Sequence, residues 1–182
     1  SEIEDALRKM EKLAEDVNRK NEEVIREVRR LSEENKKKLD DVLETLKKLV
    51  RELAEMTKRG DIREEDIKRV IREAERLVKE LDDHSKEVIK EIKERLRRVE
   101  EENKRVIDEI KKLVKEIVDK EGRDERIRTL EKAVRDLVRE LEESVDRLRR
   151  EADRLVEENE RVVERLKREL KRLVEELERR AK

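Results

Sequence analysis

The stretch that decides the fold covers residues 137–177 and reads LVRELEESVDRLRREADRLVEENERVVERLKRELKRLVEEL. A Leu-Val pair recurs within it at Leu137-Val138, Leu155-Val156 and Leu173-Val174, each pair 18 residues after the one before. Eighteen residues make about five turns of an α-helix. A seven-residue repeat imposes a left-handed supercoil and an eleven-residue repeat a right-handed one, whereas an 18-residue repeat imposes neither. The stretch therefore predicts one straight helix with an apolar stripe along its length.

The same 18-residue step organises two earlier segments of the chain. It relates Leu13, Leu31 and Leu49 in the first segment and Ile71, Ile89 and Ile107 in the second. Gly60 and Gly122 separate the segments, which predicts helices over about residues 2–58, 62–119 and 125–181. Short connections make neighbouring helices antiparallel, and no helix can bury its stripe alone. We therefore predict an all-α fold, in which residues 1–182 form a single domain: an up-down-up antiparallel bundle of three long, straight helices with little or no supercoil.

Capping residues mark the predicted helix ends. Ser1 opens a capping box, since its hydroxyl can accept a hydrogen bond from the first turn of the helix. Gly60 and Gly122 can adopt the left-handed conformation that ends a helix without steric cost. Asp61 and Asp124 follow them, and aspartate is a favoured N-cap for the next helix.

The composition excludes several classes of function. Lys and Arg number 53 and Asp and Glu 54, and the two signs are interleaved, so no basic surface for nucleic acid is expected. No apolar run is long enough for a membrane span or a signal sequence, which predicts a soluble protein without a targeting signal that would stay in the cytoplasm of an expression host. Cys is absent, so no disulfide framework is expected.

Several polar residues interrupt the aliphatic stripe, and the register of the helices groups them. Given the two short turns, facing residues have numbers that add up to roughly 120 in the first two helices and roughly 243 in the last two. The polar residues then fall into two cross-sections of the bundle: Asn21, Asn103 and Ser144, with Asn18 at the edge, and Ser32, Asn35, His84, Ser85 and Asn159.

We interpret these cross-sections as two buried hydrogen-bond layers. A buried polar group without a partner costs roughly 1–3 kcal/mol, so side chains placed together should bond one another. Sliding a helix by one repeat would set an Asn against a Leu, and the layers would thereby fix the register. The alternative is that each residue bonds its own helix backbone or water.

Signals of chemistry are weak. Asp82, His84 and Ser85 have the residue types of a hydrolytic triad, but neighbouring helical side chains point in different directions and no oxyanion hole accompanies them. One histidine without any cysteine leaves too few of the usual zinc ligands. We therefore expect no enzyme, no cofactor and no metal site. Two alternatives stay open: His84 as a pH switch, and the integrin-recognition tripeptide spelled by residues 59–61, which also suits a helix end.

The 18-residue register, the Glu/Lys/Arg surface, the Gly-Asp loops and the Asn/Ser layers give the chain a marked resemblance to computationally designed, parametric three-helix bundles. Such proteins typically have no biological activity, cofactor or native partner, and they serve as stable scaffolds. The resemblance implies a monomeric, very stable scaffold. One alternative is a binding module, either a component of a designed hetero-oligomer or a cage that accepts a further helix. The other is a natural spectrin-like spacer, although spectrin-like repeats have shorter helices and a buried Trp that this chain lacks.

Overall fold

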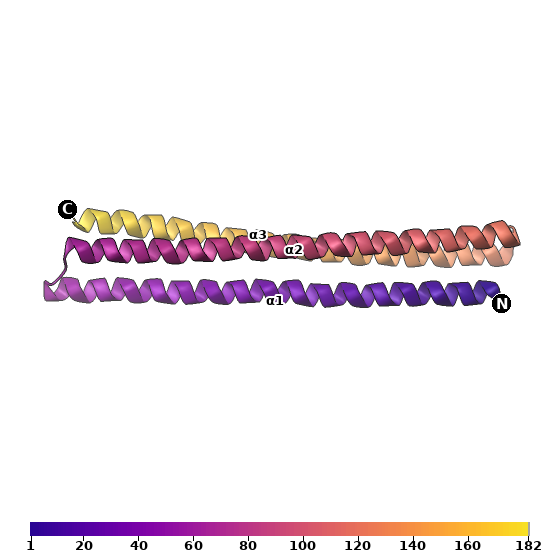
Figure 1. Ribbon diagram of the computed structural model, residues 1–182, viewed down its shortest axis with the longest axis horizontal. Helices are drawn as coiled ribbons and strands as arrows, with labels where there is room; N and C mark the ends of the chain where they lie inside the picture. Colours follow the sequence, from indigo (N-terminus) through magenta and orange to yellow (C-terminus); the bar gives the residue numbers. More distant parts are fainter. Residues whose placement is uncertain (182) are drawn as a thin grey trace. The chain divides into compact units, whose positions relative to one another are not determined.

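The computed structural model of the protein describes residues 1–181. In this range the chain forms three α-helices, α1 (Glu2–Arg59), α2 (Glu64–Glu121) and α3 (Glu125–Ala181), and no strand (Figure 1). The predicted all-α bundle of three helices is confirmed. The predicted helix ends differ from the observed ones by no more than two residues.

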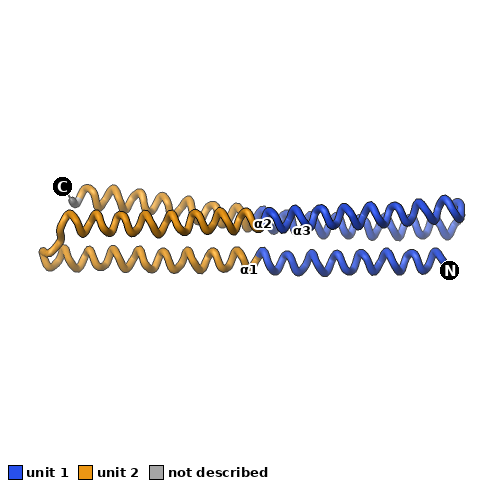
Figure 2. The backbone as a smooth tube through the Cα atoms, in the orientation of Figure 1, with its two compact units in different colours: residues 1–28, 92–154 blue, residues 29–91, 155–182 orange. Residues whose placement is uncertain are grey.

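The chain is divided into two compact units, and each contains a segment of all three helices (Figure 2). Unit 1 consists of residues 1–28 and 92–154, and unit 2 of residues 29–91 and 155–182. Within each unit the α2 segment runs antiparallel to the segments of α1 and α3. The single domain and the straight course of each helix stay predictions.

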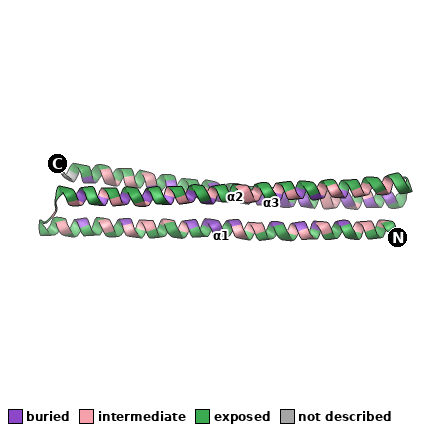
Figure 3. Cartoon of the chain, viewed as in Figure 1, coloured by how far each residue is buried: buried purple, intermediate pink, exposed green. Residues whose placement is uncertain are grey.

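The core of unit 1 is aliphatic. Met10 and Ile110 are fully buried and pack with Leu130 and Leu141 in one cluster. Leu148, also fully buried, packs with Val99 and Val145 in a second cluster. Buried residues recur along each helix between exposed ones, as the apolar stripe predicted (Figure 3).

The core of unit 2 follows the same pattern. One cluster contains Leu46, Leu81 and Leu166 together with the small residue Ala74. A second cluster lies near the α1–α2 loop and contains Leu53, Ile67, Val70 and Leu177. Burial of these side chains is the main term that stabilises each unit, because apolar area removed from water contributes roughly 25 cal/mol per Å².

The two loops end their helices on glycine. Gly60 has a φ of 70° and Gly122 a φ of 75°, the left-handed region that glycine adopts without a Cβ clash. The Gly60 N–H donates to the Thr57 carbonyl at 3.2 Å and the Asp61 N–H to the Met56 carbonyl at 3.0 Å. These two bonds form a Schellman motif, which satisfies carbonyls at the end of α1.

Asp61 does not have the predicted position of an N-cap. The helix α2 begins at Glu64, and its first intrahelical acceptor is the Arg63 carbonyl, which takes a bond from the Ile67 N–H at 3.3 Å. Arg63 is therefore the N-cap residue, and its own N–H donates to an Asp66 carboxylate oxygen at 3.1 Å. The Schellman motif uses the Asp61 backbone, which displaces the start of α2 to a later residue.

Side chains accept bonds from free N–H groups at the starts of α3 and α1. The Asp124 carboxylate accepts a bond from the Ile127 N–H at 3.1 Å, and the Asp124 carbonyl accepts the first intrahelical bond of α3. This bond to the backbone N–H is the main cause that holds the pKa of Asp124 below its ordinary value. At the start of α1, the Glu4 N–H donates to Ser1 Oγ at 3.4 Å.

We expect Asp124→Ala to lower the midpoint of thermal unfolding by roughly a few degrees, whereas Asp61→Ala should leave it unchanged. Only the Asp124 carboxylate bonds a free N–H of a helix start, although both aspartates follow a loop glycine. Thermal unfolding followed by circular dichroism compares the two variants. An equal loss in both would contradict the assignment of Arg63 as the N-cap.

Candidate functional site

Asn21, Asn103 and Ser144, one from each helix, meet in the interior of unit 1; we call them the Asn21 cluster. The amides of Asn21 and Asn103 bond each other reciprocally, at 3.3 and 3.1 Å. Asn21 Nδ2 also donates to Ser144 Oγ at 3.0 Å, and Asn103 Nδ2 donates to the Val99 carbonyl one turn earlier at 2.8 Å. All three side chains are buried, so these bonds replace their contacts with water.

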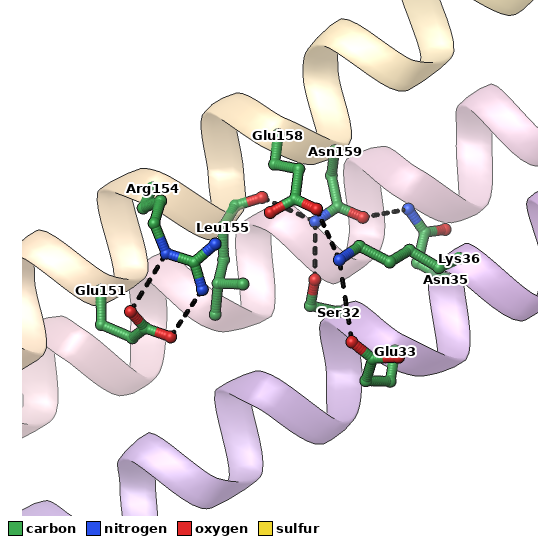
Figure 4. Close-up of polar contacts among 9 residues, drawn as sticks. All are labelled: Ser32, Glu33, Asn35, Lys36, Glu151, Arg154, Leu155, Glu158 and Asn159. Atoms are coloured by element: carbon green, nitrogen blue, oxygen red, sulfur yellow. Dashed lines mark hydrogen bonds and ion pairs between the residues drawn. The ribbon is translucent and has the colours of Figure 1, made fainter.

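A second buried group lies in unit 2 and consists of Ser32, Asn35, Ser85 and Asn159; we call it the Asn35 cluster. Asn35 Nδ2 donates to Asn159 Oδ1 at 2.7 Å, and Ser85 Oγ donates to Asn35 Oδ1 at 3.0 Å. Asn159 Nδ2 donates to Ser32 Oγ at 3.0 Å and to the Leu155 carbonyl at 2.6 Å (Figure 4). Again all three helices contribute.

The aliphatic surroundings of the two clusters increase the contribution of these hydrogen bonds to stability. In a low dielectric a hydrogen bond is stronger than in water, and an unpaired polar group is correspondingly costly. Among the described residues, the buried side-chain atoms without a hydrogen-bond partner are Asn18 Oδ1 and His84 Nε2. Neither belongs to the two clusters, so the amides of Asn21, Asn35, Asn103 and Asn159 are satisfied by the protein itself.

The sequence placed His84 within the second layer and Asn18 at the edge of the first, but neither side chain bonds a member of a cluster. His84 is half-buried, and its Nδ1 lies 3.5 Å from Lys38 Nζ on α1. The groove around it is lined by Asp41 of α1 and Glu80 of α2 as well. Burial, and then the Lys38 ammonium, lower the pKa of His84 below its ordinary value, against the opposite effect of Glu87 and Glu34.

Because of His84, we expect the free energy of unfolding to decrease slightly as the pH falls below neutrality. Its pKa is lower in the folded than in the unfolded protein, so the stabilisation is complete above the unfolded value of about 6.5 and is lost as the pH falls through that value. We expect chemical denaturation to show a weak decrease in unfolding free energy from about pH 7 to about pH 5. The variant His84→Gln should lose this slope. A slope that survives in the variant would assign it to carboxylates instead.

Ion pairs between helices flank the clusters, and the sequence reading did not find them. Lys36 Nζ of α1 lies 2.5 Å from a Glu158 oxygen of α3 (Figure 4), and Lys167 Nζ of α3 lies 3.0 Å from an Asp82 oxygen of α2. Burial alone would raise the pKa of Asp82, but Lys167 and Lys86 together lower it. The sequence signal that could have predicted these ion pairs is the opposite charge of residues that face each other in the register of the helices.

The structure gives no support to a catalytic use of Asp82, His84 and Ser85. Asp82 pairs with lysines, His84 faces Lys38, and the Ser85 hydroxyl donates to Asn35, so the three side chains have different partners. Within residues 1–181, no group of three or more His, Asp or Glu side chains is arranged to hold a metal ion. In the same range no helix is both long and apolar enough to cross a membrane.

Of the comparisons with known proteins, the one with solved structures bears on the fold. No protein-family model matches the sequence, and no curated protein is similar to it. A solved structure described as a computationally designed three helix bundle matches with a TM-score of 0.75 and 20% sequence identity, over 98% of this chain and 89% of that chain. The predicted resemblance to designed three-helix bundles is confirmed at the level of the fold.

Proposed function

We propose that the protein is a designed structural scaffold without a natural biochemical activity. Its function is to fold into one bundle with a fixed register of its helices. The aliphatic core supplies most of the stability, and the Asn21 and Asn35 clusters determine which residues of the three helices face one another. We expect a monomer of 22.2 kDa in light scattering after size exclusion.

The observation that carries this proposal is the composition of the two clusters. Each joins polar side chains from all three helices, although the neighbouring core positions are Leu, Val, Ile and Ala. Apart from the two bonds to carbonyls of the same helix, their bonds join side chains that are far apart in the sequence, so only the correct packing forms them. A buried polar network that is fully satisfied specifies a unique arrangement of its core.

Aliphatic positions alone fix the register weakly, because successive turns present similar side chains. The short loops prevent a helix from shifting far along its axis, but they tolerate a shift of a single turn. Such a slide of α1 would bring Val17 or Ile25 to the place of Asn21. Asn103 and Ser144 would then lose their partner, at a cost of roughly 1–3 kcal/mol for each buried group left unpaired.

Distances between spin labels test this role. The sequence contains no Cys, so Lys9→Cys with Arg98→Cys places two labels at exposed sites of α1 and α2 in unit 1. We expect one narrow distance distribution in this background. Adding Asn21→Leu, Asn103→Leu and Ser144→Ala removes the Asn21 cluster as a whole, and a second distance shifted by about 5 Å, one helical turn, should appear.

The comparison separates register from stability. Replacing all members of a hydrogen-bonded group by apolar residues is nearly neutral or stabilising, so the triple replacement should still fold. Circular dichroism and light scattering on the same samples verify that it does. Identical distance distributions in the two folded proteins would contradict the proposed role of the Asn21 cluster.

A further inference from the structure

A groove of about 500 Å³ lies between α1 and α3 in unit 2, and its lining includes no member of the Asn35 cluster. Its apolar floor includes Leu43 and Val50 of α1 and Leu170 and Leu173 of α3. Val50 is 39% exposed, the one large hydrophobic side chain of the described residues that is exposed rather than buried or half-buried. One exposed valine is ordinary on a protein surface, but here it is continuous with the half-buried leucines of the groove, and a contiguous apolar patch is a candidate interaction site.

The 18-residue repeat supplies an internal control for this groove. Ala14, Ser32 (a member of the Asn35 cluster) and Val50 have equivalent positions on α1, and their exposed fractions are 2%, 0% and 39%. On α3, Ala152 is buried, whereas Leu170, one repeat later, is half-buried. Small residues let two helices approach closely and larger ones hold them apart. At the third repeat Val50 and Leu170 thus replace Ser32 and Ala152, and the floor is open there, although Val134, one repeat before Ala152, is itself buried.

The polar edge of the groove is open at the same place. Lys36 reaches across from α1 to Glu158 of α3, 2.5 Å away. The residue one repeat after Lys36 is Ala54, which is exposed and too short to cross. The long cationic side chain that α1 provides at Lys36 is thus replaced by a methyl group at the equivalent position of the next repeat.

The charges on the two rims differ in sign. Lys47 and Arg51 line the groove on α1, and Glu169 lines it on α3. Between Leu43 and Arg51 the groove extends over about 12 Å of helix, roughly two turns. We infer that this α1–α3 groove docks an amphipathic helix of a partner, with an aliphatic stripe on the floor, acidic residues along α1 and basic residues along α3. This is the helix-in-groove mode of recognition, with rim charges that select the partner and its orientation.

Binding of two helical peptides tests the inference. Both carry the same leucine stripe and lactam bridges on the outer face, which hold them helical before binding and so lower the ordering cost. One has Glu on the flank toward α1 and Lys on the flank toward α3, and the other has these flanks exchanged. Fluorescence anisotropy of the labelled peptides against the full chain is expected to show at least a tenfold tighter Kd for the first peptide.

Two variants of the chain locate the site. Val50→Lys places a charge on the floor of the groove and should weaken the first peptide at least tenfold. Thr45→Lys adds the same charge to the same helix outside the groove lining and should leave the Kd unchanged. Equal binding of both peptides, no binding at all, or a Kd insensitive to Val50→Lys would overturn the inference. A dimer of the chain that Val50→Lys dissociates would also overturn it, because the occupant would then be a second copy. The spin-label experiment on unit 1 is independent of each of these outcomes.

Discussion

Replacing Asn35 by leucine is expected to lower the free energy of unfolding by about 2–4 kcal/mol, although leucine is the more hydrophobic residue. Asn35 has two roles in its cluster: its Nδ2 donates to Asn159 Oδ1, and its Oδ1 accepts the Ser85 hydroxyl. The variant therefore leaves an acceptor and a donor buried without partners. Each such group costs roughly 1–3 kcal/mol, which exceeds what the added apolar area returns. Urea or guanidinium denaturation measures the difference.

The matched control is Asn18→Leu, the same substitution on the same helix. Asn18 Oδ1 is a buried atom that already lacks a hydrogen-bond partner, so its removal should be neutral or stabilising. Replacing the whole Asn35 cluster, with leucine for Asn35 and Asn159 and alanine for Ser32 and Ser85, should recover most of the loss. If Asn35→Leu were as stable as the parent, the four side chains could not form the satisfied network described above.

The sequence was sufficient for the fold because its signals agree at every level. A register counted from two glycine loops brought Asn21, Asn103 and Ser144 to one place, and the observed bonds between them are 3.0–3.3 Å. Side chains far apart in the sequence could be matched in this way because each helix is long and each loop short. The first residue of α2 was harder to predict from the sequence, because two local patterns compete there. Asp61 is a good N-cap by type, but the Schellman motif uses its backbone and moves the cap to Arg63.

The burial of residues at the margin of the apolar stripe could not be predicted from the sequence pattern alone. His84 and Asn18 lie at the margin of the stripe, where a rotation of a few degrees decides whether a side chain enters a cluster. The exposure of Val50 depends on how closely α1 and α3 approach, and this distance is set by the residues on both helices. A one-dimensional repeat predicts which residues share a face but not the separation between the faces.

The largest effect of a single truncation is expected at Leu148, where alanine should lower the free energy of unfolding by about 3–4 kcal/mol. Leu148 is fully buried and packs with Val99 and Val145 in unit 1. Its neighbours are aliphatic residues on rigid helices, and no aromatic ring is available anywhere in the chain to turn into the cavity. Poor relaxation keeps the cost above the lower end of the range known for such truncations. Val50→Ala is the control, and it should cost less than about 1 kcal/mol because Val50 is already 39% exposed and the truncation removes little buried area.

The same variant tests whether the two compact units unfold as one domain. Leu148 lies in unit 1, while each of the three helices is divided between unit 1 and unit 2. Unfolding unit 1 alone would require all three helices to end within the bundle and would leave fresh helix ends, with their unbonded N–H and C=O groups, at three places. We therefore expect Leu148→Ala to move a single transition to lower denaturant without a change in its slope. Two transitions, with only one displaced by the substitution, would show that the units are separate cooperative domains, because the slope of each transition reports the surface exposed in it.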